Sequence, residues 1–140
     1  LSNVDIIPNS IALAQAAIES GWGKSRFAKE YNALFGEYTY DNSKGVIPLE
    51  RENGDTHLIK AFSSYSNSVE SYFDNINSHY AYEDFRDIRN IMRERNNFSN
   101  VNLLVNKLST YAEDENYINT IRQVIKTNNF SIFDQKTITY

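Results

Sequence analysis

The stretch AIESGWGKSRFA, residues 17–28, places a carboxylate at the point where an alanine-rich helix is predicted to end. The preceding letters, NSIALAQAAIES over residues 9–20, read as a short helix, and Gly21 follows where a left-handed residue often ends one. Two of the chain's five glycines flank its single tryptophan, Trp22. The pattern therefore predicts a helix that ends at Glu19 and a tight turn directly after it.

The position of Glu19 predicts a raised pKa for its carboxyl group. The carbonyl end of a helix carries partial negative charge, and apolar neighbours such as Ile18 and Trp22 disfavour the charged form by desolvation. A carboxyl group that keeps its proton near neutral pH can protonate the leaving oxygen of a glycosidic bond. Spacing alone also allows the ordinary alternative, in which Glu19 only ends a helix that Gly21 caps.

Length and composition set the broad class of the protein. The chain has 140 residues and a formal net charge of −4, so we expect one domain, 1–140, with no nucleic-acid partner. Cysteine is absent, and no apolar stretch reaches the roughly 20 residues that a transmembrane helix needs. No signal peptide is visible. The opening LSNVDIIP, residues 1–8, reads as a cut inside a longer protein.

The periodicity of apolar residues predicts a mostly helical α+β domain. Asn9 or Ser10 is expected to cap the first helix. A small β element is predicted over 36–62, with an Asn-Gly hairpin signal at 53–54. The tail, 128–140, has little periodicity and is expected to be extended.

Apolar residues at helical spacing continue from Ser66 onward. The first such helix is indicated by Val69, Tyr72, Phe73 and Ile76, which lie at i, i+3, i+4 and i+7. Further helices are predicted around 85–92, over 100–112 and over 115–126.

Three quoted stretches carry a resemblance to a known family. ALAQAAIESGWGKSRFA, residues 12–28, together with YNALFG, residues 31–36, resembles the glucosaminidase domains of glycoside hydrolase family 73. Members include the peptidoglycan-cleaving domain of flagellar rod-assembly proteins and many bacterial autolysins. The stretch NSHYAYEDFRDIR, residues 77–89, is most similar to the Bax-type subgroup. The resemblance extends from about residue 7 to about residue 126.

This resemblance implies a lysozyme-like fold, in which a helical lobe and a small β-hairpin lobe flank a cleft. The implied activity is hydrolysis of the β-1,4 bond after N-acetylglucosamine in bacterial peptidoglycan, with Glu19 as general acid. We expect an extracytoplasmic location from this substrate, the peptidoglycan glycan strand as partner, a monomeric state, and neither cofactor nor metal. His57 and His79 stand apart from any cluster typical of a metal site.

A second catalytic group is needed in most glycosidases. The acidic candidates after the first motif are Glu37, Glu50, Glu52 and Asp55. The family has a glutamate in a stretch similar to E-x-x-N-G, which Glu50 matches in ERENGD. Glu52 stays open because the length of this loop varies.

Substrate assistance is the alternative, in which the 2-acetamido oxygen of the sugar attacks the anomeric carbon. A tyrosine hydroxyl could then hold the amide. The stretch YAEDENY, residues 111–117, is similar to a family motif, and Tyr111 is the first candidate and Tyr117 the second. Either tyrosine could instead be a core residue.

Four further residues match positions of the resembling motifs. Phe35 is expected to line or support the cleft, and Trp22 either to face a sugar or to brace the turn behind Glu19. Asn32 and Gln15 are expected to orient the backbone near the site.

Other functions stay open at this stage. A muramidase or a lytic transglycosylase could use one acid on the same fold, and the reducing ends of the products would separate these activities. A sugar-binding module without catalysis, or a helical interaction domain without a ligand, would leave cell walls intact.

Overall fold

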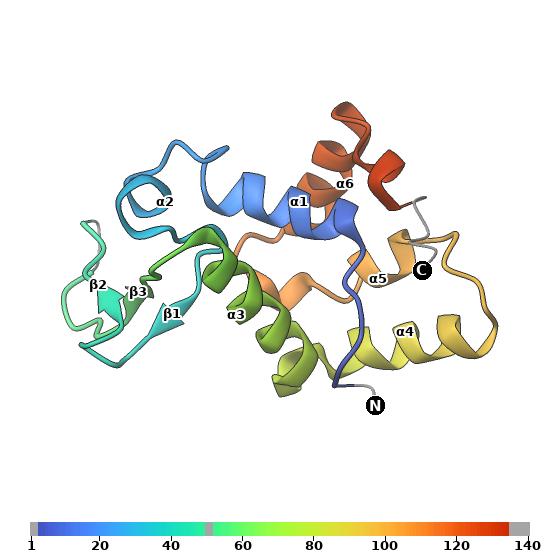
Figure 1. Cartoon of the computed structure of the whole chain (residues 1–140), viewed down its shortest axis with the longest axis horizontal. Helices are drawn as coiled ribbons and strands as arrows, with labels where there is room; N and C mark the ends of the chain where they lie inside the picture. The colour runs from blue at the N-terminus through green and yellow to red at the C-terminus, as the bar shows by residue number, and fades with distance from the viewer. Residues whose placement is uncertain (1–2, 50–51, 135–140) are drawn as a thin grey trace. The chain divides into compact units, whose positions relative to one another are not determined.

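The structure is a computed structural model that describes residues 3–49 and 52–134. In chain order the helices, 3₁₀ helices (η) and strands are α1 (Asn9–Glu19), α2 (Arg26–Tyr31), β1 (Tyr38–Thr39), β2 (Gly45–Val46), β3 (Leu58–Lys60), α3 (Tyr65–Ser78), η1 (Tyr80–Tyr82), α4 (Glu83–Glu94), α5 (Asn102–Val105), η2 (Ser109–Tyr111), α6 (Tyr117–Thr127) and η3 (Phe130–Asp134). Helices dominate and the strands are short (Figure 1), which confirms the predicted mostly helical α+β class.

The chain divides into two compact units. Residues 15–72 form one unit, which contains the end of α1, all of α2, the strands and the start of α3. The other unit combines the residues up to 14 with those from 73 onward. The prediction of one domain over 1–140 stays a prediction.

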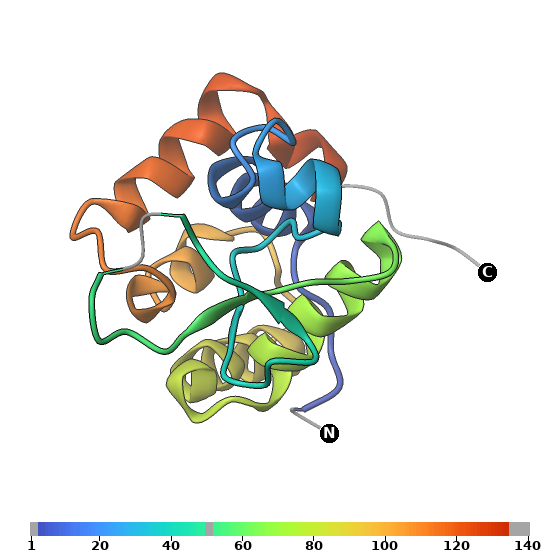
Figure 2. The same cartoon turned by 90° about the vertical axis from the view of Figure 1, so that its left-hand side faces the viewer.

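The strands of residues 15–72 form a three-stranded antiparallel sheet in the order β1-β3-β2. Ile59 in the central strand is paired with Tyr38 on one side and with Val46 on the other. Figure 2 presents this sheet from a second direction. Its strands lie inside the predicted β element, 36–62.

The predicted Asn-Gly hairpin is wrong in its connection. The Asp55 N–H donates to the Glu52 carbonyl at 3.1 Å, and Gly54 has φ +93°, so residues 52–55 form a β-turn. This turn lies inside the loop that connects β2 and β3, which are paired antiparallel. The Asn-Gly signal therefore marked the connection of a real strand pair, but that connection is much longer than a two-residue turn.

The sheet depends on one close approach at Gly45. A Cβ on this residue would lie 2.6 Å from both Leu58 Cβ and Thr39 Cγ2, which is too close for any side chain. Leu58 is buried, so the space beside Gly45 belongs to the core of this unit.

The other unit is built from short helices that pack in sequence order. Helix α4 contacts α5 and η1, and α6 contacts both α5 and η3. The single helix predicted over 100–112 is wrong, because the chain forms α5 and η2 with a break between them. There, i→i+3 bonds replace helical ones: Lys107 donates to Leu104 at 3.0 Å and Leu108 donates to Val105 at 3.1 Å.

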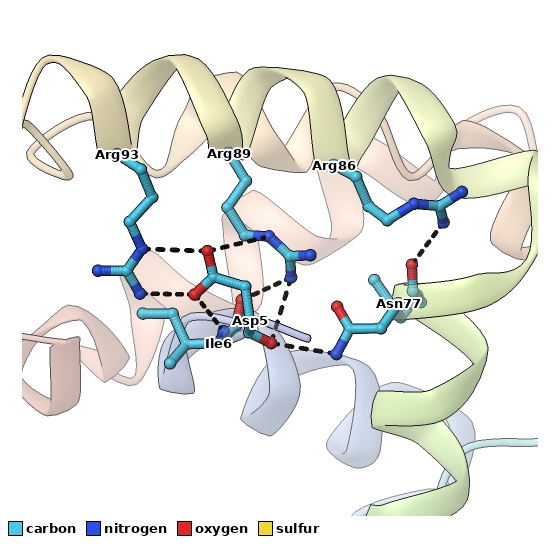
Figure 3. A network of polar contacts seen from close by, with 7 residues as sticks. Asp5, Ile6, Asn77, Arg86, Arg89 and Arg93 are labelled. Atoms are coloured by element: carbon cyan, nitrogen blue, oxygen red, sulfur yellow. Dashed lines mark hydrogen bonds and ion pairs between the residues drawn. The ribbon is translucent and has the colours of Figure 1, made fainter. Parts of the chain in front are cut away.

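Asp5 anchors the segment before α1 to helix α4 (Figure 3). Its carboxylate accepts from Arg93 Nε at 3.0 Å and from Arg93 Nη2 at 2.5 Å. Its backbone carbonyl accepts from Asn77 at 3.1 Å, and Arg89, which is fully buried, donates to the Ile6 carbonyl at 2.8 Å. The hydrogen bond from Arg93 holds the pKa of Asp5 below its ordinary value.

The start of α1 is capped from the far end of the described chain. The Asp134 carboxylate accepts from the Ser10 N–H at 2.8 Å and from the Ser10 hydroxyl. The predicted cap by Asn9 or Ser10 is therefore wrong, because both residues lie inside the helix. The tail was predicted to be extended, yet residues 130–134 form η3, which brings Asp134 to this helix. Residues 135–140 lie outside the described residues.

Across residues 3–49 and 52–134, no helix has both the length and the apolar character needed to cross a membrane.

Candidate active site

The turn after α1 is left-handed at three consecutive residues. Gly21, Trp22 and Gly23 have φ values of +58°, +59° and +76°. Glycine adopts this region freely, whereas a residue with a side chain does so at a cost of roughly 1 kcal/mol. Ser20 holds the turn, since its hydroxyl donates to the Ala16 carbonyl at 2.6 Å and accepts from the Gly23 N–H at 2.9 Å. The glycines around Trp22 thus let the chain reverse directly behind Glu19.

Trp22 itself is exposed over 55% of its surface. Much of the indole is therefore accessible to a ligand, and the choice between facing a sugar and bracing the turn stays a prediction.

Asn32 ties the end of α2 to the end of the sheet. Its φ of +55° ends the helix, and its side-chain amide donates to the Phe62 carbonyl at 3.1 Å. The Phe62 N–H in turn donates to the Tyr31 carbonyl at 2.9 Å. These bonds hold the backbone at Tyr31 and Asn32, directly before residues 33–37.

Helix α3 holds the following segment by backbone and ring contacts. The Ser68 hydroxyl accepts from the Leu34 N–H at 3.1 Å. One turn further, the Tyr72 ring stacks on Phe35 with centroids 4.0 Å apart and planes 8° apart. Phe35 is buried, so the stack fixes the backbone around it rather than presenting a ring to solvent.

Gln15 and Glu19 lie one turn apart on α1. Glu19 contacts this segment at Gly36, and Gln15 contacts Tyr72, whose ring stacks on the segment. Gln15 is fully buried and accepts from the Tyr72 hydroxyl at 2.5 Å. Glu19 is partly buried, and its carboxyl lies against Gly36. A Cβ on Gly36 would lie 2.7 Å from Glu19 Oε2, and the φ of +64° also favours glycine there. The carboxyl therefore occupies the space that a side chain at position 36 would fill.

This arrangement can present one carboxyl group in a fixed place. Its backbone is set by a helix end, its Oε2 lies 2.7 Å from where a Cβ on Gly36 would stand, and part of the residue reaches solvent. A carboxyl held in this way can exchange a proton with an oxygen of a bound ligand, provided that the ligand lies within hydrogen-bond reach.

The acidic candidates for a second group differ in their surroundings. Glu50 lies outside the described residues. Glu52 and Asp55 are exposed. Glu37 is engaged with α3, because Ser71 donates to its carboxylate at 2.6 Å. In the part of the chain that the structure describes, no three His, Asp or Glu side chains are grouped so that they could hold a metal ion.

The two predicted tyrosines belong to the other unit and stack on each other. Their ring centroids are 5.9 Å apart and their ring planes are nearly parallel. The ring centroid of Tyr82 lies 6.1 Å from that of Tyr111. Tyr117 is 3% exposed, whereas Tyr111 is only partly buried. A ligand can therefore reach Tyr111 more readily than Tyr117, and the roles of both stay predictions.

The residues of α3 that contact residues 34–37 were not predicted as site residues from the sequence. Ser68, Ser71 and Tyr72 share one face of α3 because they are spaced by three and four residues. Gly36 follows Phe35 directly in the quoted motif. The helical spacing was visible, but the sequence does not say that this polar face meets residues 34–37.

A family model described as mannosyl-glycoprotein endo-beta-N-acetylglucosaminidase, the glucosaminidase family, matches residues 1–130. Protein bax of Escherichia coli K12 is 36% identical over 112 residues, which cover 80% of this chain and 39% of that protein. Peptidoglycan hydrolase FlgJ of the same strain is 40% identical over 78 residues, which cover 49% of this chain and 25% of FlgJ. The chain thus spans well under half the length of either relative.

Two solved structures share the fold. The catalytic domain of the autolysin Auto from Listeria monocytogenes superposes with a TM-score of 0.65 at 22% identity, covering 89% of this chain and 74% of that one. An N-acetylmuramoyl-L-alanine amidase from Staphylococcus aureus gives a TM-score of 0.67 at 24% identity, covering 96% and 39%.

Proposed function

Because this chain belongs to the glucosaminidase family, we propose that it hydrolyses the glycan strands of bacterial peptidoglycan. The bond cut is the β-1,4 link after N-acetylglucosamine, and Glu19 is the general acid. The observation that carries the proposal is the Glu19 carboxyl, held at the end of α1 against Gly36. The likeness to a protein named as a peptidoglycan hydrolase supports the substrate class.

The proposed role of Glu19 is to protonate the oxygen that leaves when the bond breaks. A general acid must carry its proton when the substrate binds, and the partial negative charge at the end of α1 disfavours the carboxylate. The residue as a whole is partly exposed, which supports the approach of a ligand oxygen. Its contact with Gly36 limits the positions that the proton donor can occupy.

The second group is proposed to be either Glu50 or Tyr111, and the two imply different mechanisms. If a loop glutamate is the nucleophile or base, Glu50→Gln should remove most activity; loss of activity in Glu52→Gln instead would assign the role to Glu52, the alternative in the same loop. If the 2-acetamido group of the sugar attacks instead, Tyr111→Phe should lose more activity than Glu50→Gln, because the hydroxyl orients that group.

The test of the central proposal is Glu19→Gln, with Glu30→Gln as the control. Glu30 is an exposed acid on α2, so the control makes the same chemical change away from the site. Release of reducing ends from purified cell walls should fall by about 10²- to 10⁴-fold in Glu19→Gln. It should stay at the parental rate in Glu30→Gln. Equal rates for Glu19→Gln and the parent would refute the assignment.

Analysis of the products identifies the bond. New reducing ends of N-acetylglucosamine support the proposed cleavage, whereas reducing muramic acid ends indicate a muramidase and 1,6-anhydro ends a lytic transglycosylase. A parent chain that binds walls without releasing any ends would be a glycan-binding module. Because peptidoglycan lies outside the cytoplasmic membrane, we propose an extracytoplasmic location for this activity.

A further inference from the structure

We propose that Ser71, acting through Glu37 and Lys60, is a positioning residue for Glu19. The inference rests on the proposed function of Glu19 and adds residues to its site. These residues form a chain of polar contacts around Glu37, which lies between Gly36 and strand β1.

The contacts fix Glu37 at both its backbone and its side chain. The Lys60 N–H donates to the Glu37 carbonyl at 2.8 Å. The Ser71 hydroxyl donates to Glu37 Oε2 at 2.6 Å and accepts from Lys60 Nζ at 2.9 Å. The Glu37 side chain is only 11% exposed, so these bonds act in a partly desolvated place. Hydrogen bonds to a charged group are the stronger ones under such conditions.

Glu37 follows Gly36 directly, and the residue pair shares one peptide plane. A displacement of Glu37 therefore moves the backbone on which the Glu19 carboxyl rests. On the other side, Ser68 holds the Leu34 N–H at 3.1 Å. Gly36 is thus fixed from both directions by hydroxyl groups on one face of α3.

Loss of the Ser71 hydroxyl has a defined physical result. The Lys60 ammonium lies 4.0 Å from Glu37 Oε2, which is long for an ion pair, because the serine hydroxyl bridges the two charges. Without the bridge, the carboxylate and ammonium can approach each other, and the peptide of Gly36 moves with Glu37. The Glu19 carboxyl then loses its fixed place while it remains present.

The test compares three single variants of the full chain. Ser71→Ala removes the bridge, Ser71→Thr keeps a hydroxyl, and Ser66→Ala makes the same change at an exposed position of α3. For Ser71→Ala we expect kcat to fall about tenfold with KM within twofold of the parent, because the proton donor is misplaced while the sugar contacts remain. Ser71→Thr should restore most of kcat, and Ser66→Ala should match the parent.

A second measurement does not depend on activity. The side-chain carboxyl ¹³C resonance of Glu19, assigned by its disappearance in Glu19→Gln, should move in Ser71→Ala and stay in place in Ser66→Ala. An unmoved resonance would overturn the positioning role, whatever the kinetics show. If the parent releases no reducing ends but the resonance moves, the proposed hydrolysis fails and the positioning contact stands. Parental kcat in Ser71→Ala, with an active parent, would also overturn the inference.

Discussion

Replacing Gly36 by alanine places a methyl group where the Glu19 carboxyl lies. The new Cβ would be 2.7 Å from Glu19 Oε2, whereas ordinary van der Waals contact begins at 3.4 Å. The carboxyl, at the far end of its side chain, must then retreat by about 0.7 Å to restore ordinary contact. A misplacement near 1 Å can cost about 100-fold in rate, so kcat should fall by about 10- to 100-fold. That loss corresponds to about 1.4–2.7 kcal/mol of transition-state stabilisation.

The same substitution also strains the backbone. Gly36 has φ +64°, and a residue with a side chain in this region costs about 1–2 kcal/mol. For a chain of this size, the melting temperature should fall by about 3–6 °C. The control is Gly54→Ala, whose φ of +93° imposes comparable strain and whose Cβ would meet nothing within 4 Å.

Kinetics of reducing-end release and thermal unfolding, measured on the same samples, separate the two effects. Gly36→Ala should lose both activity and stability, whereas Gly54→Ala should lose stability alone. Parental kcat in Gly36→Ala would refute the idea that Gly36 sets the place of the acid. Equal losses of kcat in both variants would show that the strain, and not the contact, lowers the activity.

The remaining predictions concern stability. Tyr72→Phe keeps the ring stack but leaves the buried Gln15 carbonyl without its hydroxyl donor, so chemical denaturation should show a loss of about 1–3 kcal/mol. Gly45→Ala should cost about 1–3 kcal/mol in the same assay, because its Cβ would lie 2.6 Å from two neighbouring side chains. Asp5→Asn should cost about 3 kcal/mol at neutral pH, since it removes the negative charge that lies 3.7 Å from the fully buried Arg89 and also pairs with Arg93. The pKa of Asp5 is lowered in the folded state, so this difference should be complete above about pH 5 and shrink as the pH falls through that lowered value. A constant difference between the parent and Asp5→Asn from pH 7 to pH 3 would contradict the ion pair.

Local patterns predicted the elements that depend on local interactions. Helix α3 follows from apolar residues at helical spacing, and Tyr72 and Ile76 are indeed buried on one face. The end of α1 at Glu19 follows from the glycine that comes after it, because glycine adopts the left-handed conformation of the turn without steric cost. The place of the candidate acid at the helix end was therefore predictable from local sequence alone.

Contacts between distant residues were not predictable in this way. The Asn-Gly signal at 53–54 indicated a turn, but the partners of β3 lie across longer loops. The fit of Gly36 against Glu19 depends on where the end of α1 and residues 33–37 meet. Single-sequence patterns carry no information on that meeting, so they did not predict that Ser68, Ser71 and Tyr72 contact residues 34–37.

The cap that Asp134 gives to α1 has a consequence for how the domain is delimited. The family match ends at residue 130, four positions before the carboxylate that holds the Ser10 N–H. A fragment trimmed to the family boundary would therefore release the first turn of the helix whose last residue is Glu19, at a cost of about 1 kcal/mol. During synthesis on the ribosome, likewise, the first turn of this helix can gain its hydrogen bonds to Asp134 only after residue 134 has emerged.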